Sequence, residues 1–244
     1  MPNIYNAYRG RDRKSGVIDD KAVATWFPDS LSGLAVWLAA YKLIGKNDND
    51  AIDSWTDESG NGKHAVQATG NKQPIYKTNI INGLPILRFD GANDDMEMTG
   101  LSAGSDVTYF FVIKPDGTSP VGIFDSAPNT QYTFRNMSGG YLEWHSNDPN
   151  VPLLLADVNA VILTFICTRL SKRQIIYYKN GSPLSTYGGA TSDIMAWSNP
   201  RIGSVNLTAV LYDGDMAEVI IYNSALSDAN LAKVHAYLKN LYGI

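Results

Sequence analysis

An almost wholly apolar stretch lies near the end of the chain, from Gly214 to Asn223. Side chains along a strand point alternately to the two sides of a sheet. One side would carry Met216, Glu218, Ile220 and Tyr222, and the other would carry Ala217, Val219 and Ile221. Because nearly all of these residues are apolar, the stretch is predicted to be a strand covered on both faces, in the middle of a sheet. A central strand so late in the chain indicates a sandwich, with earlier strands on either side of it.

Short apolar segments separated by turn residues occupy the chain before this strand. The predicted strands are 34–38, 51–56, 85–89, 107–114, 121–124, 131–135, 141–145, 161–169, 174–178 and 182–186. The Asn-Gly pairs that begin at Asn82 and Asn180 are typical of tight hairpin turns. Many short strands with frequent turns predict an all-β sandwich.

The last element is predicted to be a helix. Ser227 is a suitable N-cap, and Gly243 suits the position just after the helix end. An apolar stripe at helical spacing lies between them, formed by Leu231, Val234, Leu238 and Leu241. His235 lies next to this stripe, so we interpret it as a structural residue.

Net charge, cysteine content and the length of apolar runs exclude some classes of protein. The chain has 244 residues, 44% of them hydrophobic, and a formal net charge of −4, which argues against a general nucleic-acid binder. Its single cysteine, Cys167, lies in an apolar segment and is predicted to be a buried, inert thiol. We see no signal peptide at the N-terminus and no apolar run long enough to span a bilayer.

The first 30 residues differ from the rest, and we predict an N-terminal arm at 1–30 and one main domain at 31–244. Basic residues cluster in the arm, at Arg9, Arg11, Arg13 and Lys14. One interpretation is a solvated tail, which short charged runs usually are. The other is an attachment segment that orders on a partner. Trp26 and Phe27 favour docking, either onto the main domain or onto a neighbour.

Four segments together resemble the concanavalin A-like lectin/glucanase superfamily, in particular its laminin-G-like domains from bacterial and phage proteins. They are 31–40 (LSGLAVWLAA), 54–65 (SWTDESGNGKHA), 83–91 (GLPILRFDG) and the late strand with its ending at 222–227 (YNSALS). The resemblance implies a jelly-roll sandwich of two curved antiparallel sheets with a C-terminal α-helix, in which the first and late strands lie close together. It also implies glycan binding, adhesion or assembly, functions that vary within this superfamily.

Some relatives are glycoside hydrolases, which need two carboxylates facing the scissile bond. Glu143 and Glu218 each stand without an acidic partner on their predicted strands. The sequence therefore predicts a protein that is not an enzyme.

Calcium is the cofactor that the resemblance suggests, held by the loop after Phe89-Asp90-Gly91. Oxygen ligands of the kind calcium takes are available at Asp90, Asn93, Asp94, Asp95 and Asp215. The late-strand position that often carries aspartate in relatives is Ala217 here, so Asp215 or Asp213 would have to substitute. The alternative is a solvated turn held by side-chain-to-backbone hydrogen bonds.

Two aromatic clusters are candidate glycan sites, because aromatic rings stack on sugars while amides and carboxylates bind hydroxyls. The candidates are Tyr141, Trp144, His145, Asn147 and Asp148 in one cluster, and Tyr187 and Trp197 in the other. The alternative is that these rings pack in the core, as most Trp and Tyr residues of β domains do.

These observations favour a non-enzymatic phage virion protein: a capsid decoration, head-fibre or tail-associated component. Its partners would be capsid or tail proteins and host-surface glycans. It would be a homo-oligomer, with a trimer plausible by analogy, and it would be located in the virion. The alternative is a free carbohydrate-binding or adhesion module of a bacterial surface system, located at the cell surface. A glycoside hydrolase is a third and weaker hypothesis.

Overall fold

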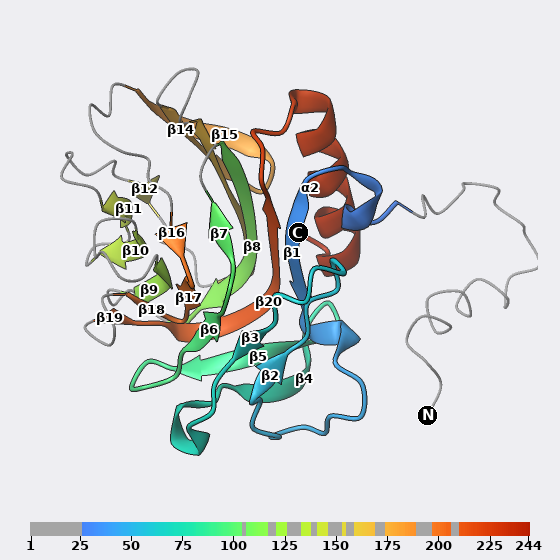
Figure 1. Cartoon of the computed structure of the whole chain (residues 1–244), viewed down its shortest axis with the longest axis vertical. Coiled ribbons are helices and arrows are strands. Elements are labelled where there is room, and N and C mark those ends of the chain that lie inside the picture. The colour runs from blue at the N-terminus through green and yellow to red at the C-terminus, as the bar shows by residue number, and fades with distance from the viewer. Residues whose placement is uncertain are drawn as a thin grey trace, which may run out of the picture.

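The computed structural model describes residues 26–103, 106–116, 121–125, 133–137, 141–145, 153–154, 159–168, 174–188, 197–205 and 210–244. These residues form two eight-stranded sheets, packed face to face, with one helix on the outer face of the first sheet (Figure 1). Every strand pairing described is antiparallel. The predicted all-β jelly-roll sandwich with a C-terminal helix is confirmed.

The first sheet is built around the late strand. In order, it contains β15 (Ser182–Gly188), β14 (Gln174–Lys179), β13 (Val161–Thr168), β8 (Val107–Pro115), β20 (Asp213–Tyr222), β5 (Leu84–Asp90) and β4 (Ile75–Ile81). β1 (Leu34–Ala39) pairs with the second half of β20, while β5 pairs with its first half. β20 is thus the central strand that the sequence predicts, and the first and late strands are neighbours.

The second sheet consists of shorter strands. In order, it contains β12 (Leu153–Leu154), β11 (Tyr141–His145), β10 (Thr133–Met137), β9 (Val121–Asp125), β17 (Arg201–Ile202), β6 (Met96–Met98), β3 (Ala65–Val66) and β2 (Ser54–Trp55). Two small ribbons complete the strands: β7 (Ser102–Ala103) with β16 (Trp197–Ser198), and β18 (Ser204–Val205) with β19 (Val210–Leu211).

A bulge in β20 changes the faces predicted for Met216 and Ala217. Against β8, Met216 pairs with Ile113 and Glu218 pairs with Val112, so Ala217 is an extra residue. Met216 therefore belongs to the core between the sheets, and Ala217 to the cluster beneath the helix. Simple alternation was wrong here, because it contains no information about a bulge. Glu218, Ile220 and Tyr222 share the helix-facing side, as predicted.

The helix α2 (Asp228–Tyr242) covers the outer face of the first sheet (Figure 1). The Ser227 side chain accepts a hydrogen bond from the backbone N–H of Asn230, and Gly243 ends the helix in the left-handed conformation. His235 is buried beneath the helix with its Nε2 2.8 Å from Thr164 Oγ1. Burial, with Lys239 nearby, lowers the pKa of His235 to about 4, so it is a neutral, structural histidine.

Most predicted strands are present, and Asn82-Gly83 forms the hairpin turn between β4 and β5 with both residues at positive φ. The predicted strand 51–56 shrinks to β2, because the N–H of buried Ile52 bonds to Pro74 outside any long ladder. Cys167 is a free thiol in the core, as predicted, and burial raises its pKa. Within the described ranges, no helix has both the length and the apolar character needed to cross a membrane.

Candidate functional site

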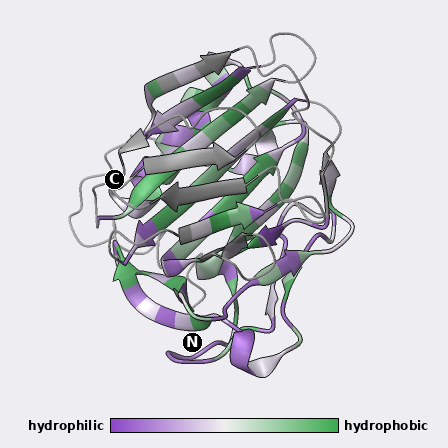
Figure 2. Ribbon diagram, turned by 90° about the vertical axis from the view of Figure 1, so that its left-hand side faces the viewer, coloured by the Kyte–Doolittle hydropathy of each residue, from purple (hydrophilic) through white to green (hydrophobic). Residues whose placement is uncertain are grey.

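The two sheets differ in what lies on their outer faces. The first sheet carries α2 and the segment around Phe27, which pack on it through an apolar cluster. The outer face of the second sheet is turned toward the viewer in Figure 2. We call this outer face the open face, because no helix of the described residues packs on it.

Polar side chains occupy the open face because the short strands there alternate. On β6, Met96 and Met98 are in the core and Glu97 between them is partly exposed. On β17, Ile202 is in the core and Arg201 is partly exposed. Arg201 lies opposite Glu97 on one side and Asp125 on the other, so these positions share a register row across three strands.

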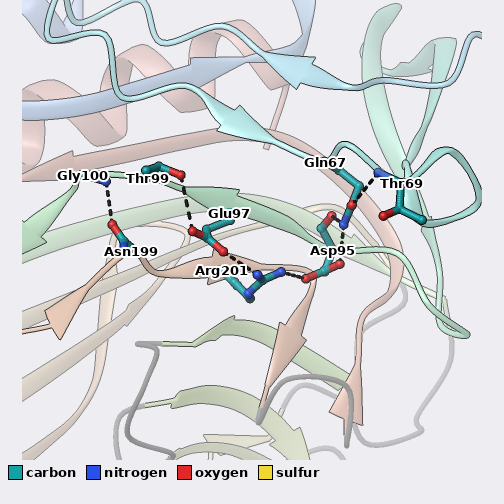
Figure 3. Close-up of polar contacts among 8 residues, drawn as sticks. All are labelled: Gln67, Thr69, Asp95, Glu97, Thr99, Gly100, Asn199 and Arg201. Atoms are coloured by element: carbon teal, nitrogen blue, oxygen red, sulfur yellow. Dashed lines mark hydrogen bonds and ion pairs between the residues drawn. The ribbon is translucent and has the colours of Figure 1, made fainter.

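Arg201 is held between two carboxylates. Its Nη1 forms an ion pair with Asp95 and its Nη2 forms one with Glu97 (Figure 3). The Arg201 side chain is 23% exposed, and those of Asp95 and Glu97 are 8% and 29% exposed. Its Nε is buried with no hydrogen-bond partner within the described part of the chain. The two ion pairs therefore fix the guanidinium in place, while its Nε–H makes no hydrogen bond to the described residues.

Amide side chains extend this arrangement at both ends. Nε2 of Gln67 donates to Oδ1 of Asp95 at 2.6 Å, and Oε1 of Gln67 accepts from the N–H of Thr69 at 3.0 Å. At the other end, Oδ1 of Asn199 accepts from the N–H of Gly100 at 2.6 Å (Figure 3). We call this set the polar row; it consists of Gln67, Asp95, Glu97, Thr99, Asn199 and Arg201.

The partly exposed members of the polar row, Glu97 and Arg201, present groups that can form hydrogen bonds with hydroxyls. Carboxylate oxygens accept from hydroxyls, and guanidinium and amide groups donate to them. Of the polar row, the sequence pattern indicated only Asp95, as a candidate metal ligand; the other five residues were not predicted. The available signal was the alternation of Met96, Glu97 and Met98, which is too short to define a strand by itself.

The predicted glycan residues fall on both sheets. β11 carries Tyr141, Trp144 and His145 in the second sheet. Position 145 pairs with Thr133 on β10, Thr133 pairs with Asp125 on β9, and Asp125 pairs with Arg201 on β17. Tyr187 lies on β15 at the edge of the first sheet, and Trp197 lies on β16 opposite Ala103. Asn147 and Asp148 lie outside the described residues. For the other five, Tyr141, Trp144, His145, Tyr187 and Trp197, the structure describes the strand but not the side chain. Their role in glycan binding stays a prediction.

Four of the five predicted calcium ligands have other partners, whereas the buried Oδ1 of Asn93 has none within the described part of the chain. Asp95 is held by Arg201 and Gln67, and Asp215 binds Arg88 through both carboxylate oxygens, at 2.7 and 3.0 Å. Oδ1 of Asp90 accepts from the N–H groups of the following loop, including that of Asn93 at 3.0 Å. This is the turn geometry of the alternative interpretation.

Asp94 is the most perturbed acid of this loop. Its Oδ2 accepts from the N–H of Asp90 at 3.0 Å. Burial, with the neighbouring charges of Asp90 and Asp95, raises its pKa to about 7. Among the described residues, no three His, Cys, Asp or Glu side chains form a group suited to a metal ion. Calcium binding stays a prediction for this loop.

Glu218 is a second acid with a raised pKa, but it lies beneath α2. Its Oε1 accepts from Trp37 Nε1 at 2.6 Å and from the Tyr237 hydroxyl at 2.9 Å, and its Oε2 accepts from the Tyr242 hydroxyl at 2.8 Å. Burial raises its pKa to about 7 even though these three donors favour the charged form. Glu218 is 1% exposed, so it forms a structural network rather than a surface site.

The predicted attachment residues divide into two groups. Arg9, Arg11, Arg13 and Lys14 lie outside the described residues. Trp26 and Phe27 pack against the main domain, each with its ring centroid 6.1–6.4 Å from that of Tyr237. The Tyr222 hydroxyl then donates to the carbonyl of Pro28 at 2.9 Å. Docking onto the main domain, which the sequence left open, is the arrangement observed for residues 26–28.

A comparison with protein-family models gives one match, over residues 90–232, to the model described as the concanavalin A-like lectin/glucanases superfamily. The match spans more than half of the chain. The chain belongs to this superfamily. Its lectin-like jelly-roll fold agrees with that membership. No curated protein matches the sequence.

Solved structures with a similar fold include two proteins with sugars bound. The sialidase of Trypanosoma rangeli in complex with sialic acid is 13% identical with a TM-score of 0.61, covering 84% of this chain and 33% of that one. The present chain thus spans about a third of the sialidase. Domain 4 of the arabinanase AbnA from Geobacillus stearothermophilus, in complex with arabinotriose, is 16% identical with a TM-score of 0.59. The match covers 83% of this chain and 98% of the arabinanase domain. At these identities the likeness shows the fold.

Proposed function

We propose that the chain is a non-catalytic glycan-binding domain whose binding surface includes the polar row. The observation that carries the proposal is the Arg201 guanidinium, fixed between Asp95 and Glu97 (Figure 3) on the open face. Fixed donors and acceptors lose little conformational freedom when they bind hydroxyls, which favours recognition of sugars. The arabinanase domain with bound arabinotriose, covered over 98% of its length, supports the same function.

The non-catalytic part of the proposal rests on the state of the carboxylates. A glycoside hydrolase needs one carboxyl group that is protonated and open to the substrate, and a second that faces it. Asp95 and Glu97 are both ion-paired with the same guanidinium, so each already has a partner within the protein. The buried Glu218 is enclosed by Trp37 and two tyrosines. These arrangements support binding without bond cleavage.

The test is an immobilised glycan array probed with the full-length chain, followed by calorimetry on the glycans that bind. Glu97→Gln removes one acceptor charge of the polar row. Glu58→Gln is its control, because Glu58 is similarly exposed at 26% and pairs with Lys42 outside the row. We expect Glu97→Gln to weaken binding about tenfold, as for the loss of one charged hydrogen bond. We expect the control to bind like the wild type, and no glycan to be cleaved.

A role in a phage virion is a second candidate function, as a capsid decoration, head-fibre or tail-associated protein. The observation that favours it is the aromatic contact of Trp26 and Phe27 with Tyr237. This contact anchors the residues that follow the basic segment to α2. We propose that Arg9, Arg11, Arg13 and Lys14 then attach the domain to an acidic partner surface. Capsid or tail proteins would be that partner, and a homo-oligomer would present several copies.

Charge reversal of these four residues tests the second candidate. Co-sedimentation with phage particles should fall with the four-residue glutamate variant and stay unchanged with Lys233→Glu, a control on exposed helix surface. Equal sedimentation of all three proteins would contradict attachment through the arm. Glycan binding would be unaffected by either variant, so the two candidate functions are tested independently.

A further inference from the structure

A hollow of about 350 Å³ lies at the rim of the sandwich, beyond the Gly100 end of the polar row. It is formed by the start of β1, the loop before β3, the turn before β7 and the residue after β20. Its lining residues are Gly33, Leu34, Ala35, Asn61, Lys63, Gly100, Leu101, Ser102 and Asn223. This volume is within the range of small-molecule sites, which begin at roughly 300 Å³.

The loop that supplies Asn61 and Lys63 is held rigidly by one buried carboxylate. Asp57 is 6% exposed, and its oxygens accept from the N–H groups of Trp37 and Lys63, each at 2.9 Å. Asn61 in turn donates its amide N–H to the carbonyl of Leu34 at 2.9 Å. The backbone at Lys63 and the side chain of Asn61 are therefore held in place without a ligand, which reduces the entropy cost of binding.

The ammonium of Lys63 has no ion-pair or hydrogen-bond partner among the described residues. The two acids of its loop are engaged elsewhere, because Asp57 binds backbone donors and Glu58 pairs with Lys42 at 3.4 Å. Lys63 Nζ lies 3.1 Å from the point where a side chain on Gly100 would begin. The glycine thus leaves the space beside the ammonium open.

The rest of the lining combines polar groups with apolar side chains. Within the described part of the chain, the Asn223 amide, the Ser102 hydroxyl and Oδ1 of Asn61 have no internal partner. Leu34 is partly exposed and is the apolar residue of the lining that a ligand could contact. The amide and hydroxyl groups can form hydrogen bonds with the hydroxyls of a sugar.

We propose that this hollow binds a carboxylate-bearing sugar residue, with its carboxylate on Lys63 and its hydroxyls on Asn61, Ser102 and Asn223. The proposal rests on the proposed function, because it takes the ligand to be a saccharide. It deepens that function by adding a subsite for a carboxylate-bearing residue next to the polar row. An acidic glycan would then cross the row and place its charged residue at the rim.

The experiment follows backbone amide shifts of the full-length protein by NMR during titration with glucuronate, glucose and acetate. We expect glucuronate to shift the amides of Lys63 and Gly100 and to bind about tenfold more tightly than glucose, the effect of one charged hydrogen bond. Lys63→Gln should remove this preference. Lys233→Gln, an equal charge change on the exposed side of α2, should keep it.

Three results would overturn the inference. They are equal affinity for glucuronate and glucose, a preference that survives Lys63→Gln, or acetate binding as tightly as glucuronate, which would mean an anion site without sugar recognition. If any of these occurs while array glycans still bind in a Glu97-dependent way, the subsite for a carboxylate-bearing residue fails and the proposed function stands. If no sugar binds in either experiment, both fail.

Discussion

Trp37 and Glu218 are joined by a hydrogen bond of 2.6 Å from the indole Nε1 to Oε1, between positions 181 residues apart in the sequence. The bond connects β1 to β20 on the face beneath α2. Tyr237 and Tyr242 bring the helix into the same contact, since both hydroxyls donate to the carboxylate. One buried acid thus links the first strand, the late strand and the last helix.

Replacing this acid should change how stability depends on pH. The pKa of Glu218 rises from an ordinary value of 4.5 to about 7 on folding, so the folded state favours the protonated acid. The stabilisation of the folded state by the protonated Glu218 carboxyl is fully present below pH 4.5 and is lost as pH rises through about 7. The total change in the free energy of unfolding is roughly 3 kcal/mol. Glu218→Gln should therefore flatten the pH dependence of unfolding by urea between pH 4.5 and 8. A curve with the wild-type slope would contradict the assignment.

The donor side of the bond can be tested with a tryptophan pair. Trp37→Phe removes an N–H that Glu218 uses, whereas Trp55→Phe removes a buried N–H with no partner among the described residues. Both side chains are almost fully buried, so the lost apolar volume is similar. We expect Trp37→Phe to lower the free energy of unfolding by about 1–2 kcal/mol more than Trp55→Phe. Equal losses would mean that the hydrogen bond contributes nothing net.

Asp94 should behave as a second, independent pH-sensitive group. Burial and the charges of Asp90 and Asp95 raise its pKa from 3.8 to about 7, so its ionised form destabilises the fold. The stability gained from the protonated form is fully present below pH 3.8 and disappears as pH rises through about 7. Asp94→Asn retains an oxygen to accept from the N–H of Asp90. We expect this variant to have a higher Tm than the wild type at pH 8 and an equal one near pH 4.

The calcium prediction is tested by thermal unfolding in calcium and in chelator. Arg201 and Arg88 already neutralise Asp95 and Asp215, so we expect calcium to leave the Tm unchanged. A rise in Tm that Asp94→Asn abolishes would instead support a calcium site at the acidic loop. Magnesium at the same concentration controls for general screening of charge.

Gly203 should tolerate no side chain. Its φ is +84°, and an added Cβ would lie 2.4 Å from Cε1 of Phe89, a fully buried ring. Gly60 has a similar φ of +86°, but a Cβ added there would have no atom within 4 Å. Gly60→Ala therefore measures the cost of the backbone conformation without a steric clash. We expect Gly60→Ala to cost about 1 kcal/mol and Gly203→Ala about 3 kcal/mol or more, measured by urea unfolding. Comparable losses would show that the core can shift around Phe89.

The sequence predicted long elements better than short ones. β8, β13 and β20 each have a continuous apolar segment, and α2 has a cap at each end, so local pattern alone located them. β3, β6 and β17 have two or three residues each, which is too few for a period to emerge. The polar row lies on these three strands and the turns beside them, and most of it was therefore missed.

What the sequence determined by itself was the class of fold: a late central strand, an all-β sandwich, a capped terminal helix, a buried thiol and the superfamily. Each depends on contacts between near neighbours in the chain or on the pattern of buried faces. Tertiary structure alone decided that Ala217 is a bulge, that Trp37 reaches Glu218, and that Arg201 lies between Asp95 and Glu97. These features depend on strand register across long sequence separations, and alternation along a single strand contains no information about its partner's register.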